Sequence, residues 1–486
     1  MDFLRVIAAL ALPWLIGTLI VHYLAPSLEV GRRALVLGYG YLAGVLAITL
    51  LMRASDAIGF RLELVNLLSL LLPLSGVVAL MAFQIGRPVG GRWLSKAYLE
   101  LPMWQKILAT ALLSLVAMRL GGFWLEVYWR PLYPWDAFMH WATKARVWTD
   151  AQAILPFVDY DQWLALRGEA VFTDNHPDYP IMTPLLQTWM NLVLGRWDDA
   201  LMNLPWPLLA FAGGLAFFAQ ARLAGVGPLT TAVFSYLLLS LPLLNLQIAL
   251  AGYADIFLGF FYLAAVMAFY QWCSTRDYWQ GILSFVFALG CLLIKNEGFF
   301  WLLTFLPGIA ALLLPRRWFW LLAGLGILAV LAILAFLPTD IKVAGHTLEG
   351  LNLNFRTEAL VPLLQSLFIF SNWHLLFWLA IALLLTGILK GYLTGSPWPP
   401  ALFALAIVVA TATSLLLILF LFTKFSGGAI RHTAAGRITL QIAPALCFFS
   451  MLLFHNLNTK SHKRFIASAH SPDQYRHSQL HPPTPQ

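Results

Sequence analysis

The sequence predicts an all-α polytopic membrane protein. Hydrophobic residues make up 60% of its 486 residues and charged residues only 11%, against about 25% charged residues in an ordinary soluble protein. Long apolar runs recur from residue 4 to residue 457, and a helix that crosses a bilayer needs about 20 predominantly apolar residues. Because these runs are continuous rather than alternating, they exclude a transmembrane β-barrel.

Thirteen apolar segments are expected to form transmembrane helices. They cover residues 4–24, 34–52, 63–84, 107–123, 205–219, 228–248, 254–272, 281–294, 298–314, 317–338, 374–390, 399–422 and 438–457. A shorter apolar stretch, 181–194, is too short to cross comfortably and is expected to be a re-entrant or surface helix.

Four regions follow from this pattern. We expect extra N-terminal helices in residues 1–106, a membrane core in 107–338 with a large loop at 124–183, C-terminal helices in 339–457, and a disordered cytoplasmic tail in 458–486. The tail is polar and rich in Pro, His and Ser, a composition that does not fold readily on its own.

The net charge of +8 is interpreted as a membrane-orienting signal and not as a nucleic-acid surface, because cytoplasmic loops collect Lys and Arg. Basic clusters occur at Arg87, Arg92, Lys96 and Lys106, at Arg316 and Arg317, and at Lys460, Lys463 and Arg464. If these clusters are cytoplasmic, alternation places loop 124–183 and the connections 249–255, 295–297 and 423–437 on the outer side. The bilayer is therefore an expected partner and nucleic acid is not.

No cofactor site stands out in the sequence. The three cysteines, Cys273, Cys291 and Cys447, lie far apart in apolar stretches, which indicates neither a metal cluster nor a disulfide framework. The chain also carries no phosphate-binding Gly-rich motif between a strand and a helix, so no nucleotide site is expected.

The outer loop 124–183 is both acidic and rich in tryptophan, with eight of the 22 acidic residues and six of the 20 tryptophans. Such a loop can be an interfacial aromatic belt or a platform that binds a sugar or a lipid. After Pro134 the sequence predicts a helix on the membrane, in which Asp136, His140 and Lys144 are spaced by four and share one face. Asp136 could orient His140, both residues could approach one substrate, or Asp136 could cap the helix.

Asp174, His176 and Asp178 alternate in the TDNHPDYP sequence at 173–180. In an extended chain alternate side chains face the same way, so these three could bind a divalent metal or sugar hydroxyls. Asn, Asp and Pro are also common turn residues, and the segment could simply be a proline-braced turn.

Charged residues also stand at the ends of apolar segments. A charge in the middle of a membrane costs about 2.5–3.5 kcal/mol on insertion scales, so such residues usually mark a site. Asp255 opens the segment 254–272, as a helix cap or a site carboxylate. Lys295 and Glu297 lie between two very apolar runs, either as a structural ion pair or as a cation for a phosphate with Glu297 holding it in place.

The connection 423–437 is basic although alternation places it outside, with Lys424, Arg431, His432 and Arg437. An anionic lipid headgroup at the outer leaflet would explain these charges. The competing interpretation is that this connection is cytoplasmic.

Four short motifs follow one another within residues 120–315: Trp135-Asp136, HPDYP at 176–180, GYAD at 252–255 and LIKNEG at 293–298. In their order and spacing they resemble the membrane glycosyltransferases of the GT-C class. The likeness is closest to bacterial members of family 39, the protein O-mannosyltransferases and lipid A aminoarabinose transferases. The chain departs from that family where Ala137 follows Asp136 and where Asn-Glu replaces Gly-Pro after Lys295, which implies a distinct subfamily.

The resemblance implies a polyprenyl-phosphate-linked sugar donor and transfer, with inversion at the anomeric carbon, on the periplasmic side of a bacterial inner membrane. It implies that Asp136 is the catalytic carboxylate, and it matches Asp255 and Lys295 to a second acidic position and to a hairpin lysine of the family. We expect Asp136 to act as general base on the acceptor hydroxyl, and Lys295 with Arg431 or Arg437 to stabilise the leaving phosphate.

The remaining expected substrate-binding residues are His140, Lys144, His176, Asp178, Glu297 and His432, with His176 and Asp178 placed against sugar hydroxyls. The acceptor could be a glycan, a lipid or a protein. A transporter or lipid flippase would need polar residues through the bilayer midplane, whereas here they gather at one face. A polysaccharide polymerase or ligase would keep the same site and change only the acceptor.

Overall fold

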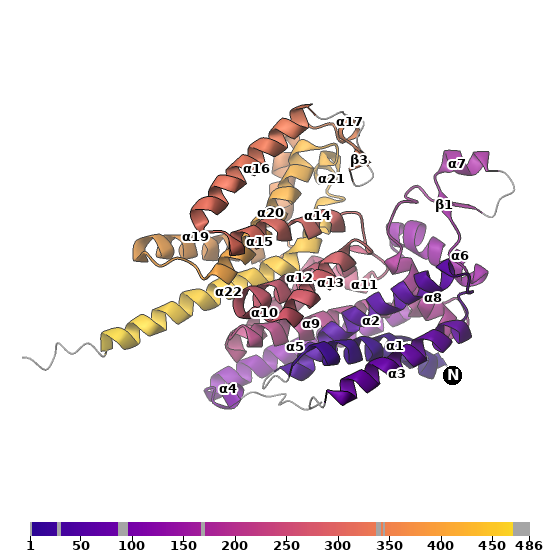
Figure 1. Cartoon of the computed structure of the whole chain (residues 1–486), viewed down its shortest axis with the longest axis horizontal. Coiled ribbons are helices and arrows are strands. Elements are labelled where there is room, and N and C mark those ends of the chain that lie inside the picture. The colour runs from indigo at the N-terminus through magenta and orange to yellow at the C-terminus, as the bar shows by residue number, and fades with distance from the viewer. Residues whose placement is uncertain are drawn as a thin grey trace, which may run out of the picture.

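The computed structural model describes residues 2–26, 31–85, 96–166, 171–336, 342–343 and 346–469. Its helices form an elongated bundle (Figure 1). The N-terminus and the elements of the large loop lie at one end of the bundle, which we name the loop end. The C-terminal part of the last helix lies at the opposite end.

The N-terminal helices are α1 (Asp2–Leu24), α2 (Arg32–Ala57), α3 (Leu64–Gln84), α4 (Lys96–Leu99) and α5 (Met103–Trp129). The large loop holds η1 (Ala137–Ala142), α6 (Thr143–Ala151), β1 (Phe157–Val158), α7 (Tyr160–Ala165), β2 (Phe172–Thr173) and α8 (Met182–Leu194). Strands β1 and β2 are parallel and pair Phe157 with Phe172. Element η1 is a short π-helix, a form that is rare and often found at functional sites.

The central elements are η2 (Leu201–Asn203), α9 (Pro205–Leu223), α10 (Pro228–Ser240), α11 (Pro242–Ala249), α12 (Asp255–Thr275), α13 (Tyr278–Cys291), α14 (Gly298–Leu303), α15 (Phe305–Leu313) and α16 (Arg316–Phe336). The C-terminal ones are β3 (Lys342–Val343), β4 (His346–Thr347), α17 (Leu348–Leu351), η3 (Thr357–Ala359), α18 (Leu360–Leu364), η4 (Gln365–Ile369), α19 (Leu376–Thr394), α20 (Pro400–Phe422), α21 (Ser426–Ile430) and α22 (Ala435–Ala469).

The chain is a multi-pass helical membrane protein. In the described part of the chain nine helices are long and apolar enough to cross a bilayer, and the bent pair α10–α11 makes ten. The pair bends by 56° at Pro242, because proline lacks the amide hydrogen that would continue the helical hydrogen bonds. The expected segments 281–294, 298–314 and 317–338 are also helical (α13, α14–α15 and α16) but are not among these ten, so the number thirteen stays a prediction.

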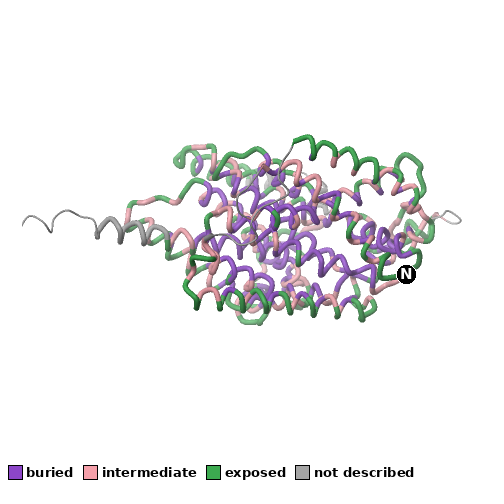
Figure 2. Tube along the Cα trace, turned by 90° about the horizontal axis from the view of Figure 1, so that it is seen from below, coloured by how far each residue is buried: buried purple, intermediate pink, exposed green. Residues whose placement is uncertain are grey.

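Burial separates central from peripheral helices. The apolar windows of α12 and α22 are each 89% buried inside the protein, whereas that of α3 is 11% buried. Buried residues accordingly gather along the middle of the bundle, with exposed ones around it (Figure 2). Helices α12 and α22 pack side by side, and hydrogen bonds between Arg437 and Asp255 join their first turns.

Two expectations about element positions need correction. Stretch 181–194 is not a surface helix: α8 packs against α1, α2 and α6, and nearly all its residues are buried, the polar Thr183, Gln187, Thr188 and Asn191 included. The expected tail does not begin at 458, since α22 continues to Ala469; residues 470–486 lie outside the described part of the chain.

Candidate functional site

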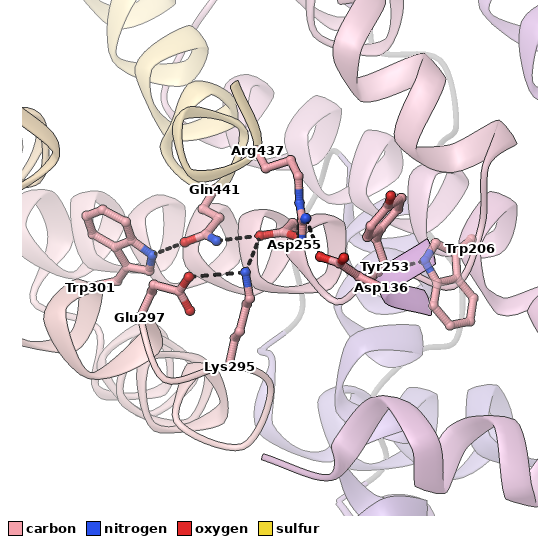
Figure 3. Close-up of polar contacts among 9 residues, drawn as sticks. All are labelled: Asp136, Trp206, Tyr253, Asp255, Lys295, Glu297, Trp301, Arg437 and Gln441. Carbon is pink, nitrogen blue, oxygen red and sulfur yellow. Dashed lines mark hydrogen bonds and ion pairs between the residues drawn. The ribbon is translucent and has the colours of Figure 1, made fainter. Parts of the chain in front are cut away.

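An arginine from the start of α22 joins two aspartates at the loop end. Arg437 donates Nε and Nη2 to Oδ2 of Asp255, at 3.2 and 3.1 Å, and Nη1 to Asp136 (Figure 3). Its guanidinium also lies 4.7 Å from the centroid of the Tyr253 ring. Asp255 is fully buried, whereas the Asp136 side chain is 32% exposed. Asp136 is therefore the more accessible partner of Arg437.

A lysine completes the pairing of Asp255. Lys295 Nζ lies 2.8 Å from Oδ1 of Asp255 and 3.1 Å from Oε1 of Glu297. Gln441, one helical turn after Arg437, donates to the same Oδ1 at 2.7 Å and accepts from Trp301 at 2.7 Å. Both oxygens of the buried Asp255 carboxylate thus accept hydrogen bonds, because a charge is stable away from water only when it is paired and hydrogen-bonded.

Two glycines allow the close approaches that build this site. A Cβ at Gly298 would come within 2.0 Å of the Cys291 carbonyl oxygen, so only glycine lets the LIKNEG hairpin fold back tightly. Gly252 has φ 110° and would bring a Cβ within 2.7 Å of Ala137, the neighbour of Asp136. The GYAD turn and the loop that carries Asp136 can therefore lie against each other.

The side chains of Asp136 and Asp255 do not serve as helix caps. Asp136 precedes η1 and makes no capping hydrogen bond, and Asp255 is the first residue of α12. Helices α12 and α22 both direct their N-termini into the cluster, and a helix N-terminus favours negative charge. We name Asp136, Asp255, Lys295, Glu297, Arg437 and Gln441 the ion cluster.

A second group of polar side chains forms inside the large loop around Asp174. His140 Nδ1 lies 2.6 Å from Oδ1 of Asp174, Lys144 Nζ binds Oδ2, and the backbone amide of His176 donates to Oδ1 at 3.1 Å. Burial alone would raise the pKa of Asp174, but these donors outweigh it and hold the pKa at about 2. We name Asp174, His140 and Lys144 the loop cluster.

Tyr179 connects the two clusters. Its ring stacks on the ring of His176 at 4.5 Å and on that of Trp141 at 5.2 Å. Burial raises its pKa to about 12, and its hydroxyl interacts electrostatically with Lys295, Glu297, Arg437 and Asp255. Tyr179 is therefore a protonated donor at neutral pH, beside the ion cluster.

Hydrogen bonds on both sides of Tyr179 fix that position. Asn296, the neighbour of Lys295, donates to Oδ2 of Asp178 at 2.8 Å. The backbone amide of Met182 donates to the carbonyl of Leu293 at 3.1 Å. The segment after β2 is thus tied to the hairpin that carries Lys295.

The structure places the predicted residues as follows. It brings Asp136, Asp255, Lys295, Glu297 and Arg437 together, and it separates His140 and Lys144 from Asp136, because both turn to Asp174 instead. Asp174, His176 and Asp178 do not share one face as an extended chain would require: residues 175–179 form a turn around Pro177. The backbone here thus has the geometry of a proline-braced turn and not of an extended strand.

Two of the basic residues lie elsewhere. Arg431 is exposed, and His432 packs its ring 4.9 Å from that of Phe370. Among the residues that the structure describes, neither forms an ion pair with the ion cluster. The described residues also contain no group of three or more His, Cys, Asp or Glu arranged to hold a metal ion.

Sequence reasoning missed Tyr179 and Gln441. Tyr179 carries no charge that would draw attention to it, although it stands in the HPDYP motif. Gln441 follows Arg437 by four residues, the helical spacing that places both on one face. Comparison of the chain with models of known protein families, with curated proteins and with solved structures found no match.

Proposed function

We propose that this protein transfers a sugar from a polyprenyl-phosphate-linked donor to an envelope acceptor at the loop end of the bundle, which faces the periplasm of a bacterial inner membrane. The observation that carries the proposal is the pairing of Arg437 with the accessible Asp136 directly beside the buried Asp255–Lys295 pair. Arg437, a cation that can bind a phosphate, then lies next to Asp136, a carboxylate that can accept a proton from a hydroxyl.

The donor phosphate binds at Arg437 by replacing Asp136. Arginine binds phosphate through two parallel hydrogen bonds, and the N-termini of α12 and α22 add favourable potential there. Arg437 keeps Asp255 as a partner throughout, because Asp255 is buried and also held by Lys295 and Gln441. Donor binding thereby frees the Asp136 carboxylate.

The freed Asp136 acts as general base. It takes the proton of the acceptor hydroxyl as that oxygen forms a bond to the anomeric carbon. The bond between the anomeric carbon and the phosphate oxygen breaks, and its electron pair stays on the phosphate. Arg437 and Lys295 stabilise the added negative charge, and such electrostatic stabilisation is usually the largest contribution to catalysis.

Residues of the large loop position the donor. Tyr179 donates a hydrogen bond to the phosphate, since its hydroxyl is protonated and lies beside Lys295. His176 and Asp178 are exposed next to Tyr179 and bind sugar hydroxyls. His140 and Lys144 act on donor binding indirectly. They bind the Asp174 carboxylate, which accepts a hydrogen bond from the backbone amide of His176.

The distribution of polar residues along α12 argues against a transporter. Asp255 and Gln271 are 16 residues apart, or about 24 Å along the helix, and between them α12 carries apolar residues, Gly259, Tyr262 and Tyr270. Gln271 belongs to a separate buried group, where it donates to the carbonyl of Gln220 at 3.0 Å. A path for a polar substrate would need polar groups in between.

Gene deletion and complementation test the proposal. The deletion strain is restored with wild type, with Asp136→Asn, or with Asp150→Asn as matched control, since Asp150 is an exposed carboxylate of the same loop that pairs with Arg146. Mass spectrometry of envelope glycans and lipids should show one sugar missing in the deletion, restored by wild type and the control but not by Asp136→Asn. A missing polymer, and not a missing single sugar, would indicate a polymerase or ligase. Full restoration by Asp136→Asn at equal expression would refute its role as base.

A further inference from the structure

An apolar cleft lies away from both clusters, between α16, α19, α20 and α22. It has a volume of about 1170 Å³, and apolar side chains form nearly all of its lining. Along α20 it runs from Phe403 to Leu417, which corresponds to about 21 Å of helix. One leaflet of a bilayer contributes about 15 Å of hydrocarbon, so the cleft is long enough for a lipid chain of one leaflet.

Helix α16 leaves this cleft open on one side. Of its residues 316–329 only Phe319 is buried, and the helix is inclined across α19 and α20 rather than packed along them (Figure 1). The cleft is therefore continuous with the space that surrounds the helices. A lipid can enter it sideways, without passing the ion cluster.

One end of the cleft carries fixed positive charge. Arg316 lines the cleft, and its Nη2 donates to the Trp398 carbonyl at 2.9 Å while its guanidinium lies 4.8 Å from the centroid of Phe403. The neighbouring Arg317 lies 5.7 Å from the centroid of the Trp318 ring. Both arginines are exposed.

Aromatic residues mark the same end as lying at the depth of lipid headgroups. Trp318, Trp320 and Tyr392 are 49%, 57% and 84% exposed, and Trp and Tyr concentrate where a membrane meets water. This end is opposite to the loop end, because α16 and α20 both begin there. A basic group at headgroup depth above an apolar cleft has the chemistry of an anionic phospholipid site.

We propose that this cleft binds one anionic phospholipid from the leaflet opposite the ion cluster, with its phosphate on Arg316 and Arg317 and an acyl chain along α20. The occupant is a structural lipid and not the sugar donor, because the charged end of the cleft and the ion cluster lie at opposite ends of the bundle. The lipid fills the gap that α16 leaves and holds α16 to α20.

Native mass spectrometry of the full chain, purified in mild detergent and supplied with phosphatidylglycerol or phosphatidylcholine, tests the site. Wild type should retain one phosphatidylglycerol per chain in preference to phosphatidylcholine. Replacing both arginines (Arg316→Gln with Arg317→Gln) should weaken retention of phosphatidylglycerol by roughly 10- to 30-fold, because each basic side chain near an anionic lipid contributes about a fivefold preference. Arg276→Gln is the matched control, since Arg276 is exposed, lies over Trp272 and does not line the cleft.

A second variant tests the apolar part. Ala410 lines the cleft and is exposed on α20, so Ala410→Phe fills the cleft without disturbing the core and should also expel the lipid. Equal retention of both lipids by wild type, or unchanged retention in the Arg316/Arg317 variant, would refute the proposal. So would recovery of a polyprenyl phosphate from the cleft of wild type that Ala410→Phe removes.

Discussion

Asp136 and Arg437 are 301 positions apart in the sequence, yet their side chains form an ion pair. Arg437 thereby links the large loop, which carries Asp136, to the start of the last helix. The same guanidinium also binds Asp255 at the start of α12. Arg437 is a cation in the first turn of a helix, where the helix dipole disfavours positive charge. Two carboxylates offset that cost, and only one of them is accessible.

Arg437→Lys should weaken donor binding more than it weakens the fold. Lysine keeps the charge but lacks the planar fork with which Arg437 contacts Asp136 and Asp255 at once. We expect the KM for a polyprenyl-phosphate sugar to rise about tenfold, which corresponds to about 1.4 kcal/mol. Arg431→Lys, an exposed arginine six residues earlier, is the control and should leave the KM unchanged. Equal effects of the two changes would show that Arg437 does not bind the donor.

The two aspartates should differ in their contribution to stability. Asp255→Asn leaves Lys295 buried with a weakened counter-charge, and breaking a buried ion pair costs about 3–5 kcal/mol. Asp136→Asn removes only the partly exposed partner of Arg437 and should cost less than about 1 kcal/mol, while activity falls about 100-fold or more. Thermal unfolding in detergent measures the loss of stability in each variant, and a sugar-transfer assay measures the loss of activity in Asp136→Asn. A larger loss of stability in Asp136→Asn would contradict the assigned roles.

Tyr179→Phe removes one oxygen and keeps the ring stack with His176 and Trp141. Loss of one hydrogen bond to a charged group corresponds to about 1.5–3 kcal/mol, so we expect catalytic efficiency to fall about 10- to 100-fold at unchanged stability. Tyr133→Phe is the control, because Tyr133 lies in the same loop and is 77% exposed. If Tyr179→Phe retains full activity while wild type transfers sugar, Tyr179 is only a packing residue.

Acid should loosen the large loop in a defined range of pH. The folded pKa of Asp174, about 2, lies below its ordinary value, so its ion pairs stabilise the loop above an unfolded pKa of about 3.9. This contribution, about 2–3 kcal/mol, is lost as the pH falls from about 4 through about 2. Limited proteolysis of the loop across this range, followed by mass spectrometry, would detect the change. Asp174→Asn should abolish this pH dependence and make the loop sensitive already at pH 7.

The sequence by itself determined the class of fold. Within the residues that the structure describes, each of the thirteen apolar segments is helical over most of its length, because a continuous apolar run in a membrane must satisfy its backbone hydrogen bonds internally. It also singled out Asp255 and Lys295, since charges next to or within apolar segments can mark a site. Asp136 and Arg437 were candidates because of the predicted loop helix and the basic connection 423–437.

Only the tertiary structure decided which of these charges meet. The spacing of four residues predicted that His140 lies beside Asp136. In the structure, the segment that leads into the turn around Pro177 places Asp174 in contact with His140 and Lys144 instead. Arg431 and Arg437 were equivalent candidates in the sequence, and only the position of α22 against α12 selects Arg437. Ion pairs act over a few ångströms, and the position of one helix against another depends on packing over its whole length, which no local pattern contains.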